Sequence, residues 1–380
     1  MVKILNINHI WWKTGSFQLL DTISKWMWNN YQFHNLFWYC FWNVENSTSL
    51  YKTNNSKLYR NCRYKLAVGF NLLFDWLTPW HIDLKFLHNY KPYVETDIIH
   101  IHSVLWWFFD WNILPEISKE KKVIMTFHDD WIVSWNDKNN LFPYKTKKQY
   151  EKRKNIFQNS NISFVWVSNR ITNKIKDDWI VWTNNITTIY NWINPNIFHK
   201  KNKIISKKEL WLSLNKKIIL SVAWAWKKSS LKWIQYVEKL HKEYKDRQDL
   251  LFISLGNDKN KIISKNFIEI GFLSSKDMSK YFSSADLFLY PTLMDSFWLV
   301  VAESFACWCP IVTFETWWVP EIVHHKKNWY IAKYRDYEDL KEWFNWTLNN
   351  LNNLDVELSN RFYQENMINE YKKLYNDLLK

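Results

Sequence analysis

Short apolar runs alternate with segments of helical periodicity along most of the chain. Runs of about four to eight apolar residues are typical of buried strands, and apolar residues spaced three or four apart are typical of amphipathic helices. Their alternation predicts parallel sheets built from βαβ units, and therefore an α/β fold. In the first half, the predicted strands are Val2–Asn8, Gln32–Tyr39, Asp97–His102, Lys122–Phe127, Ser163–Ser168 and Asn185–Tyr190.

The same pattern restarts in the second half. The strands predicted there are Lys217–Ala223, Asp249–Leu255, Phe267–Ile270, Asp286–Tyr290, Pro310–Thr313 and Tyr330–Ala332. The predicted helices are one opening near Thr14-Gly15-Ser16, then Leu231–Glu243, Lys276–Ser283, Val300–Cys307, Tyr337–Asn349 and an amphipathic helix over Asn360–Lys380. The stretch Asn43–Leu66 lacks either period and is predicted to be an irregular insertion.

A chain of 380 residues is long for a single core, so two domains are expected. We predict two Rossmann-like domains, residues 1–195 and 196–359, that face each other across a cleft. The final helix, residues 360–380, is expected to return to the first domain. Ligands of such sheets bind at the carboxyl ends of the strands.

Tryptophan and glycine are present in inverted proportions, with 28 Trp and only 4 Gly. At the usual share of about 7%, roughly 27 glycines would be expected in this chain. The simplest explanation is that UGA codons, read as glycine in the source organism, have been translated as tryptophan. Trp131 and Trp346, which lie in apolar or aromatic settings, are expected to be genuine.

Many of the tryptophans stand at turns between apolar runs, where a positive φ favours glycine. Examples are Trp192, Trp233, Trp308, Trp329 and the doublet Trp317-Trp318. The competing interpretation takes the tryptophans literally, as an aromatic surface for glycans, membranes or single-stranded nucleic acid. Such a surface favours a helical or alternating spacing, whereas these residues cluster at turns.

The remaining composition restricts the function only broadly. The net charge is +14, but the lysines are spread over many segments, which indicates a solvated surface and leaves contact with an anionic membrane as a secondary possibility. No apolar run is long enough for a transmembrane helix, and the N-terminus does not resemble a signal peptide. Four scattered cysteines do not form a disulfide framework, and Cys307 and Cys309 are expected to be buried at a helix end. These features favour a cytoplasmic protein.

The strongest chemical signal lies between Pro291 and Pro310, where Asp295 and Glu303 stand eight residues apart across a strand-to-helix junction. With glycine at position 298, the backbone N–H groups of Trp298, Leu299 and Val300 would form an anion site at a helix N-terminus. With glycines restored, this stretch resembles the E-x7-E motif of GT-B glycosyltransferases, specifically the retaining family four. Thr316–Val323 and Asn328–Tyr330 look like the GG-x-PE-x-V and NGY segments of that family.

Three further segments agree with this resemblance and extend it over nearly the whole chain. Lys227 and Lys232 match a cationic pair of the family, and Asn191–Asn194 resembles its interdomain NGI segment. The stretch Trp11–Ser16, restored as GGKTGS, looks like the glycine-rich loop that follows the first strand. The segment from His100 to Trp131 resembles a capsule or exopolysaccharide subgroup with H-x-H and HD-x-W motifs.

The resemblance implies a retaining, metal-independent transfer of a sugar from a nucleotide sugar to a glycan or lipid-linked acceptor, with no cofactor and no nucleic acid involved. It assigns His128 and Asp295 to catalysis, and Trp11, Trp12 and Gly15 to a loop for acceptor or phosphate. Donor binding falls to Lys227, Lys232, Trp298, Leu299, Val300 and Glu303. The cell envelope and the inner face of the membrane are the expected setting.

Two departures from the family pattern affect the site. Asp295 replaces the usual Glu and is one methylene shorter, and Lys227 replaces an Arg, so bidentate contact with phosphate is lost while the charge remains. The alternatives are a nucleotide-sugar epimerase of the same fold, which lacks the paired acidic motif, and a Trp-rich glycan- or nucleic-acid-binding protein. His100, His102 and His128 also remain open to a structural role, and a metal at this histidine cluster is disfavoured because the chemistry of the family needs none.

Overall fold

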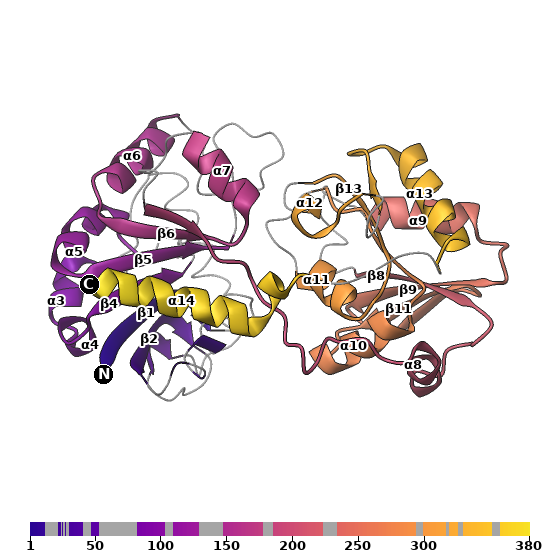
Figure 1. The fold of residues 1–380 in the computed structure, drawn as a ribbon, viewed down its shortest axis with the longest axis horizontal. Helices are drawn as coiled ribbons and strands as arrows, with labels where there is room; N and C mark the ends of the chain where they lie inside the picture. Colours follow the sequence, from indigo (N-terminus) through magenta and orange to yellow (C-terminus); the bar gives the residue numbers. More distant parts are fainter. Residues whose placement is uncertain are drawn as a thin grey trace. The chain divides into compact units, whose positions relative to one another are not determined.

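The chain was analysed as a computed structural model. The structure describes residues 1–11, 22–23, 25, 27, 30–40, 47–52, 82–102, 109–128, 147–177, 185–222, 234–293, 299–316, 319–325, 330–351 and 358–380. These residues form two compact units, each with its own sheet (Figure 1). Unit 1 comprises residues 1–190 and 368–380, and unit 2 comprises residues 191–367.

Unit 1 contains a seven-stranded sheet in the order β3-β2-β1-β4-β5-β6-β7, and every neighbouring pair is parallel. The strands are β1 (Val2–Trp11), β2 (Tyr31–Cys40), β3 (Ser47–Lys52), β4 (Ile98–His102), β5 (Lys122–Phe127), β6 (Ile162–Trp166) and β7 (Ile186–Thr188). The six strands predicted for this half are therefore confirmed. They are readable from the sequence because central parallel strands are buried on both faces and form continuous apolar runs.

The prediction of an irregular insertion over residues 43–66 is wrong in one part. Residues 47–52 form β3, an edge strand that pairs with β2. The sequence STSLYK has no continuous apolar run, so its hydropathy does not predict a strand. The strand is defined by its pairing with β2, which is a tertiary contact.

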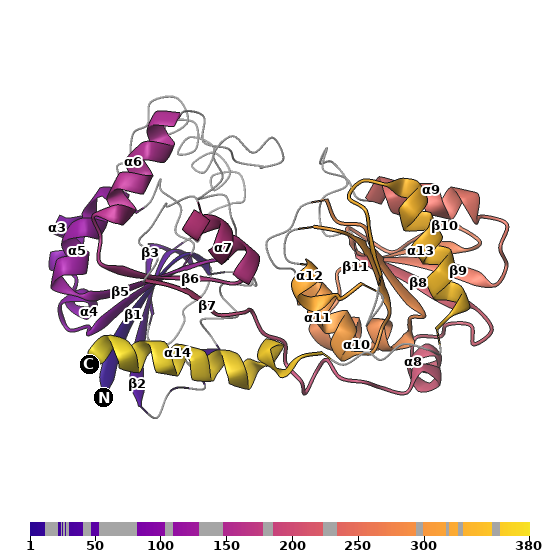
Figure 2. The same cartoon turned by 45° about the horizontal axis from the view of Figure 1, so that its top comes forward.

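Helices pack on both faces of this sheet (Figure 2). They are α3 (Leu84–His88), α4 (Lys91–Val94), α5 (Leu114–Glu120) after the short 3-10 helix η1 (Trp111–Ile113), α6 (Lys147–Gln158), α7 (Asn169–Asp177) and the final helix α14 (Gln364–Leu379). The predicted helix near residues 14–16 lies outside the described residues. The predicted final helix is confirmed, and its residues from Ile368 onward belong to unit 1.

The two faces of the unit 1 sheet differ in chemistry. One face carries Leu5, Ile7, Ile99, Ile101 and Met125, which form an apolar core with residues of α3 to α7. The opposite face is covered by α14, whose Tyr371 and Tyr375 are both fully buried (Figure 2). This opposite face carries buried polar side chains that come from neighbouring strands in register: Asn6, Asn8, His100, His102 and Thr126.

Unit 2 contains a second seven-stranded sheet in the order β10-β11-β9-β8-β12-β13-β14. The strands are β8 (Lys217–Val222), β9 (Leu250–Asn257), β10 (Lys261–Ser264), β11 (Phe267–Gly271), β12 (Leu287–Tyr290), β13 (Ile311–Phe314) and β14 (Tyr330–Ala332). All six predicted strands are confirmed, and β10, which was not predicted, is an exposed antiparallel edge strand. Lys261, Ile262 and Ile263 are all exposed, so this strand has no buried apolar run from which it could be predicted.

The helices of unit 2 are α8 (Lys203–Glu209), α9 (Ile234–Glu243), α10 (Ser275–Ser284), α11 (Leu299–Ala306), α12 (Val319–Ile322), α13 (Tyr337–Asn349) and the 3-10 helix η3 (Asn360–Phe362). The four helices predicted between residues 231 and 349 are confirmed, with ends within a few residues. Serine and aspartate side chains cap two of them, since Ser274 accepts from the amide of Asp277 and Asp336 accepts from the amide of Asp339.

Helices α8 and α11 end in the same backbone motif. After α8, the amide of Trp211 donates to the carbonyl of Lys208, and the amide of Leu212 donates to the carbonyl of Lys207. After α11, Trp308 donates to Phe305 and Cys309 donates to Ser304. These paired bonds are the Schellman motif, in which the residue just after the cap adopts a left-handed conformation and is usually glycine.

The residues in that left-handed position are Trp211 and Trp308, with φ of 55° and 59°. Trp211 is 94% exposed, so packing of its indole does not account for the conformation. Trp192, which also stands at a predicted turn, does not adopt a positive φ, so that part of the prediction is wrong. Trp346, which was predicted to be genuine, packs on the core of unit 2, whereas Trp131 lies outside the described residues.

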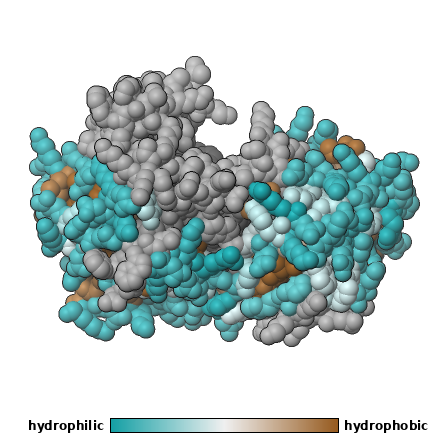
Figure 3. Space-filling model, turned by 90° about the horizontal axis from the view of Figure 1, so that it is seen from above, coloured by the Kyte–Doolittle hydropathy of each residue, from teal (hydrophilic) through white to brown (hydrophobic). Residues whose placement is uncertain are grey.

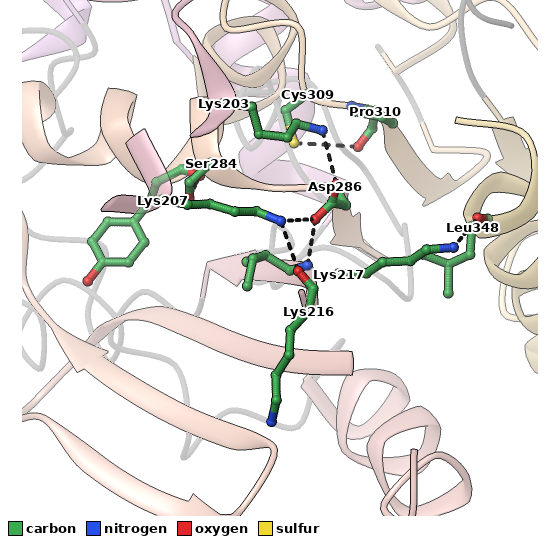
Figure 4. Close-up of polar contacts among 11 residues, drawn as sticks. Lys203, Lys207, Lys216, Lys217, Ser284, Asp286, Cys309, Pro310 and Leu348 are labelled. Carbon is green, nitrogen blue, oxygen red and sulfur yellow. Dashed lines mark hydrogen bonds and ion pairs between the residues drawn. The ribbon is translucent and has the colours of Figure 1, made fainter. Parts of the chain in front are cut away.

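A buried ion-pair cluster holds α8 against the amino ends of β8 and β12 (Figure 4). The ammonium group of Lys207 lies 2.9 Å from Asp286 and also donates to the carbonyl of Lys216 at 2.8 Å. Lys203 lies 3.1 Å from the second oxygen of Asp286, and the amide of Ile218 donates to this carboxylate at 2.8 Å. Every charged group of this cluster is thus compensated, at the end of the sheet opposite to the expected ligand edge.

Burial alone would raise the pKa of Asp286. The charge of Lys203, the amide of Ile218 and the ammonium group of Lys207 outweigh that effect and lower the pKa. Asp286 therefore remains ionised at neutral pH, and the cluster is a structural ion pair.

On the face shown in Figure 3, the described surface is mostly hydrophilic and its apolar residues form separate small patches. Among the described residues, no helix has the length and apolar character needed to cross a membrane. Cys307 and Cys309 are buried at the end of α11, as predicted.

Candidate functional site

Five of the predicted site residues are described by the structure: Trp11, His128, Leu299, Val300 and Glu303. Trp11 and His128 lie at the carboxyl ends of strands in unit 1, where ligands of parallel α/β sheets bind, and the other three lie on a helix of unit 2. The other predicted site residues, Trp12, Gly15, Lys227, Lys232, Asp295 and Trp298, lie outside the described residues.

In unit 2 the predicted donor-binding helix is α11. It begins at Leu299, just after the carboxyl end of β12, so the amides of Leu299 and Val300 belong to its first turn. Amides of a first helical turn have no partner within the helix and can bind an anion. Anion binding at these amides stays a prediction.

Glu303 lies one turn further along α11 and is half-buried. Burial raises the pKa of its carboxyl group from 4.5 to about 8. A carboxyl group that is desolvated in this way is stabilised as an anion only when a ligand or a neighbouring group supplies hydrogen bonds or positive charge. Strongly shifted carboxyl groups of this kind are concentrated at functional sites, which makes Glu303 the leading candidate of unit 2.

In unit 1 the predicted residue His128 follows β5 directly, and Trp11 is the last residue of β1. Burial lowers the pKa of His128 to about 4, so its imidazole is neutral at pH 7. Its ring stacks on that of His102, the last residue of β4, with ring centroids 5.9 Å apart. The ring of His100 contacts that of His102 in a tilted arrangement, with centroids 3.9 Å apart, so three histidines form a continuous row.

The rings of His102 and His128 are stacked, whereas those of His100 and His102 are tilted by 37°. No group of three or more His, Cys, Asp or Glu side chains within the described part of the chain could hold a metal ion. Burial, helped by the charge of His128, lowers the pKa of His100 to about 3. The pKa of His102 is lowered well below 6.5 by burial and by the charges of His100 and His128.

His100 has a structural role that the sequence left open. Its Nδ1 lies 2.7 Å from the hydroxyl of Tyr375, and its Nε2 lies 2.8 Å from the hydroxyl of Thr126. The hydroxyl of Tyr371 lies 3.2 Å from the same Thr126 oxygen. His100 therefore attaches α14 to β4 and β5, a contact that no local motif predicts because it joins residues 275 positions apart.

Comparisons with known proteins give the class to which this fold belongs. Residues 202–366 match the family model "Glycosyl transferases group 1". The chain is 24% identical to N-acetyl-alpha-D-glucosaminyl L-malate synthase from Bacillus anthracis over 40% of its own length and 41% of that protein. It is 29% identical to an uncharacterized glycosyltransferase from Haemophilus influenzae, over 44% and 47% of the two chains. The chain thus matches less than half the length of these curated relatives.

Solved structures resemble the whole chain. HepE from Anabaena, in complex with UDP, has a TM-score of 0.69 at 14% identity. The match covers 99% of this chain and 100% of that chain. Sucrose-phosphate synthase from Thermosynechococcus elongatus also has a TM-score of 0.69, at 12% identity, over 100% of this chain and 99% of that enzyme. The fold is therefore that of the GT-B glycosyltransferases, with two Rossmann-like domains and parallel sheets.

The fold alone does not separate the candidate activities. UDP-GlcNAc 2-epimerase from Methanocaldococcus jannaschii also resembles the chain, with a TM-score of 0.56 at 11% identity, over 99% of both chains. The family match in unit 2, which contains α11 and Glu303, supports a glycosyltransferase of group 1 and does not favour the epimerase.

Proposed function

We propose that this protein transfers a sugar from a nucleotide-diphosphate sugar to a hydroxyl group of a glycan or lipid-linked acceptor, with retention of configuration at the anomeric carbon. Glu303 carries this proposal, because it is a desolvated carboxyl group on the helix that follows β12, inside the segment that matches the family. The presence of UDP in the related HepE structure supports a nucleotide donor.

In unit 2, Glu303 would hold the ribose hydroxyls of the donor. Asp295 and the backbone of Trp298, Leu299 and Val300 would hold the hydroxyls of the sugar. Lys227 and Lys232 would stabilise the negative charge of the departing diphosphate, as positioned cations do in phosphoryl chemistry. In unit 1, the loop containing Trp11, Trp12 and Gly15 would contact acceptor or phosphate, and neutral His128 would position the reacting sugar.

The reaction breaks the bond between the anomeric carbon and the diphosphate oxygen. The acceptor oxygen bonds to the same face of that carbon, and its proton passes to the leaving phosphate oxygen. No metal and no cofactor take part in this proposal. We place the protein in the cytoplasm, at or near the inner face of the membrane, in the synthesis of a cell-envelope polysaccharide.

The test is a screen of nucleotide sugars with the full chain, in which mass spectrometry follows release of the nucleotide. Glu303→Ala should lower kcat/KM by about 10- to 100-fold, because hydrogen bonds to a charged group contribute roughly 1.5–3 kcal/mol. Glu238→Ala, an exposed carboxylate in the middle of α9, is the matched control and should leave kcat/KM unchanged.

Full activity of the Glu303→Ala protein would refute the assigned role. Interconversion of the donor sugar without transfer would favour the epimerase, and glycan binding without any turnover would favour the binding protein. For an active enzyme, the anomeric coupling constant of the product decides retention, and activity in excess EDTA decides whether a metal is needed.

We also propose that Trp211 and Trp308 stand where the native protein has glycine, as UGA recoding implies. Two Schellman motifs with tryptophan in the left-handed position support this proposal. Trp166 would be a genuine tryptophan, because its ring is fully buried and stacks on Phe127 with centroids 4.8 Å apart. Peptide mass spectrometry of the protein from its native cells should find glycine at 211 and 308 and tryptophan at 166.

A further inference from the structure

His102 differs from His100, its neighbour on the same face of β4, in its hydrogen bonding. Its ring is fully buried, yet neither Nδ1 nor Nε2 has a hydrogen-bond partner in the described structure. His100, two residues earlier on the same face of β4, uses both of its ring nitrogens. The two side chains share a strand, a face and nearly the same burial, so the difference lies in their partners.

This lack of partners carries a free-energy cost. A neutral imidazole has one donor and one acceptor, and each of these groups loses its hydrogen bonds to water on burial without gaining a partner. Native structures rarely retain such groups without a compensating role. A phenylalanine at this position would fill a similar volume without that cost.

The position of His102 indicates what its role is. It is the last residue of β4, and its Cα is paired with Asn8 of β1 and Thr126 of β5. It therefore lies at the carboxyl edge of the central strands, where ligands of such sheets bind. Its ring stacks on His128, the residue proposed to position the reacting sugar.

From this arrangement we infer that His102 is a substrate-positioning residue, whose neutral imidazole hydrogen-bonds a hydroxyl group of the sugar bound next to His128. This inference rests on the proposed glycosyltransferase function. A sugar hydroxyl both donates and accepts, so a single hydroxyl can satisfy either tautomer of the ring. Burial keeps His102 neutral, so the contact does not change across the neutral pH range.

The experiment combines stability and activity in three variants of the full chain. His102→Phe should leave the melting temperature unchanged or raise it, and should lower kcat/KM by about 2- to 10-fold with the donor found in the screen, since a neutral hydrogen bond contributes about 0.5–1.5 kcal/mol. His102→Gln, which keeps a donor and an acceptor, should recover most of that activity. His100→Phe is the matched control and should lower the melting temperature, because it removes the buried hydrogen bonds that His100 makes with Tyr375 and Thr126.

The donor and the acceptor are separated by two assays. A raised KM for donor hydrolysis in the absence of acceptor assigns the hydroxyl to the donor sugar. A change seen only in transfer assigns it to the acceptor.

Three outcomes would overturn the inference alone: a His102→Phe protein as active as the wild type, a marked loss of stability in that variant, or a His102→Gln protein as impaired as His102→Phe. Absence of turnover with every donor in the wild type would instead refute the proposed function, and the inference with it.

Discussion

The two sheets of this protein bury polar side chains at opposite edges and with opposite outcomes. In unit 2, Asp286 lies at the amino edge and is compensated by Lys203, Lys207 and a backbone amide. In unit 1, His102 lies at the carboxyl edge, and neither ring nitrogen has a partner in the described structure. The sheets share their parallel architecture, so the contrast is not a consequence of the fold.

The difference shows how a buried polar group can be interpreted. A group whose hydrogen-bonding capacity is satisfied within the protein adds to the structure, and its loss is felt as instability. A group without a partner at a ligand edge is available to a ligand, which is the role we infer for His102. The ring centroids of His100 and His102 lie 3.9 Å apart on one strand, so the two residues can be compared directly.

The largest change in stability is expected at the amino edge of the unit 2 sheet. Asp286→Ala leaves Lys207 buried without its partner, and breaking a buried pair in this way costs about 3–5 kcal/mol. Asp249→Ala is the control, because its pair with Arg247 is exposed and worth at most about 1 kcal/mol. Urea unfolding of both variants measures the difference, and equal losses would show that the Asp286 cluster is not structural.

The response to pH should separate the two units. His100 is held neutral, with a folded pKa of about 3 against 6.5 when exposed, so the unfolded chain binds more protons between these values. The stability of unit 1 should therefore fall as pH drops below about 6.5, by about 3 kcal/mol for His100 alone at about pH 4. Amide hydrogen exchange of the unit 1 strands measures this loss.

Unit 2 should respond in the opposite direction. The pKa of Glu303 is raised to about 8, so the folded state binds more protons between 4.5 and 8. Its contribution to stability is present below pH 4.5 and is lost as pH rises towards 8. The quantity to compare is the free energy of opening, obtained from the protection of the strands against exchange. The same pH dependence of this free energy in both units would contradict the opposite responses expected from His100 and Glu303.

The smallest effect concerns the left-handed tryptophans. Trp211→Gly and Trp308→Gly should each raise the free energy of unfolding by about 1–2 kcal/mol, because only glycine adopts that conformation without a steric cost. Trp166→Gly should instead be strongly destabilising, since it empties a fully buried site in β6. Loss of stability in all three variants would argue against recoding at 211 and 308.

The sequence by itself determined the order of strands and helices in both halves. Strands such as Lys122–Phe127 and Tyr330–Ala332 were predicted to the residue, because burial on both faces demands a continuous apolar run. It also predicted α11, since a strand-to-helix junction is a local pattern, whereas the role of Glu303 stays a prediction. The edge strands β3 and β10 were missed because the sequence of β3 has no continuous apolar run and the side chains of β10 are largely exposed. The edge strand β14 was predicted, since Tyr330 and Ala332 are buried.

Only the tertiary structure decided which of the chemically similar residues does what. His100 and His102 are equivalent in the sequence, and the hydroxyls of Thr126 and Tyr375, brought in by β5 and α14, satisfy one and not the other. Likewise, positions 166 and 211 both carry tryptophan in the sequence. Trp166 stacks on an aromatic ring in the core, whereas Trp211 follows a helix end with a positive φ. Partners and backbone conformation depend on segments distant along the chain, and no local pattern of residues contains them.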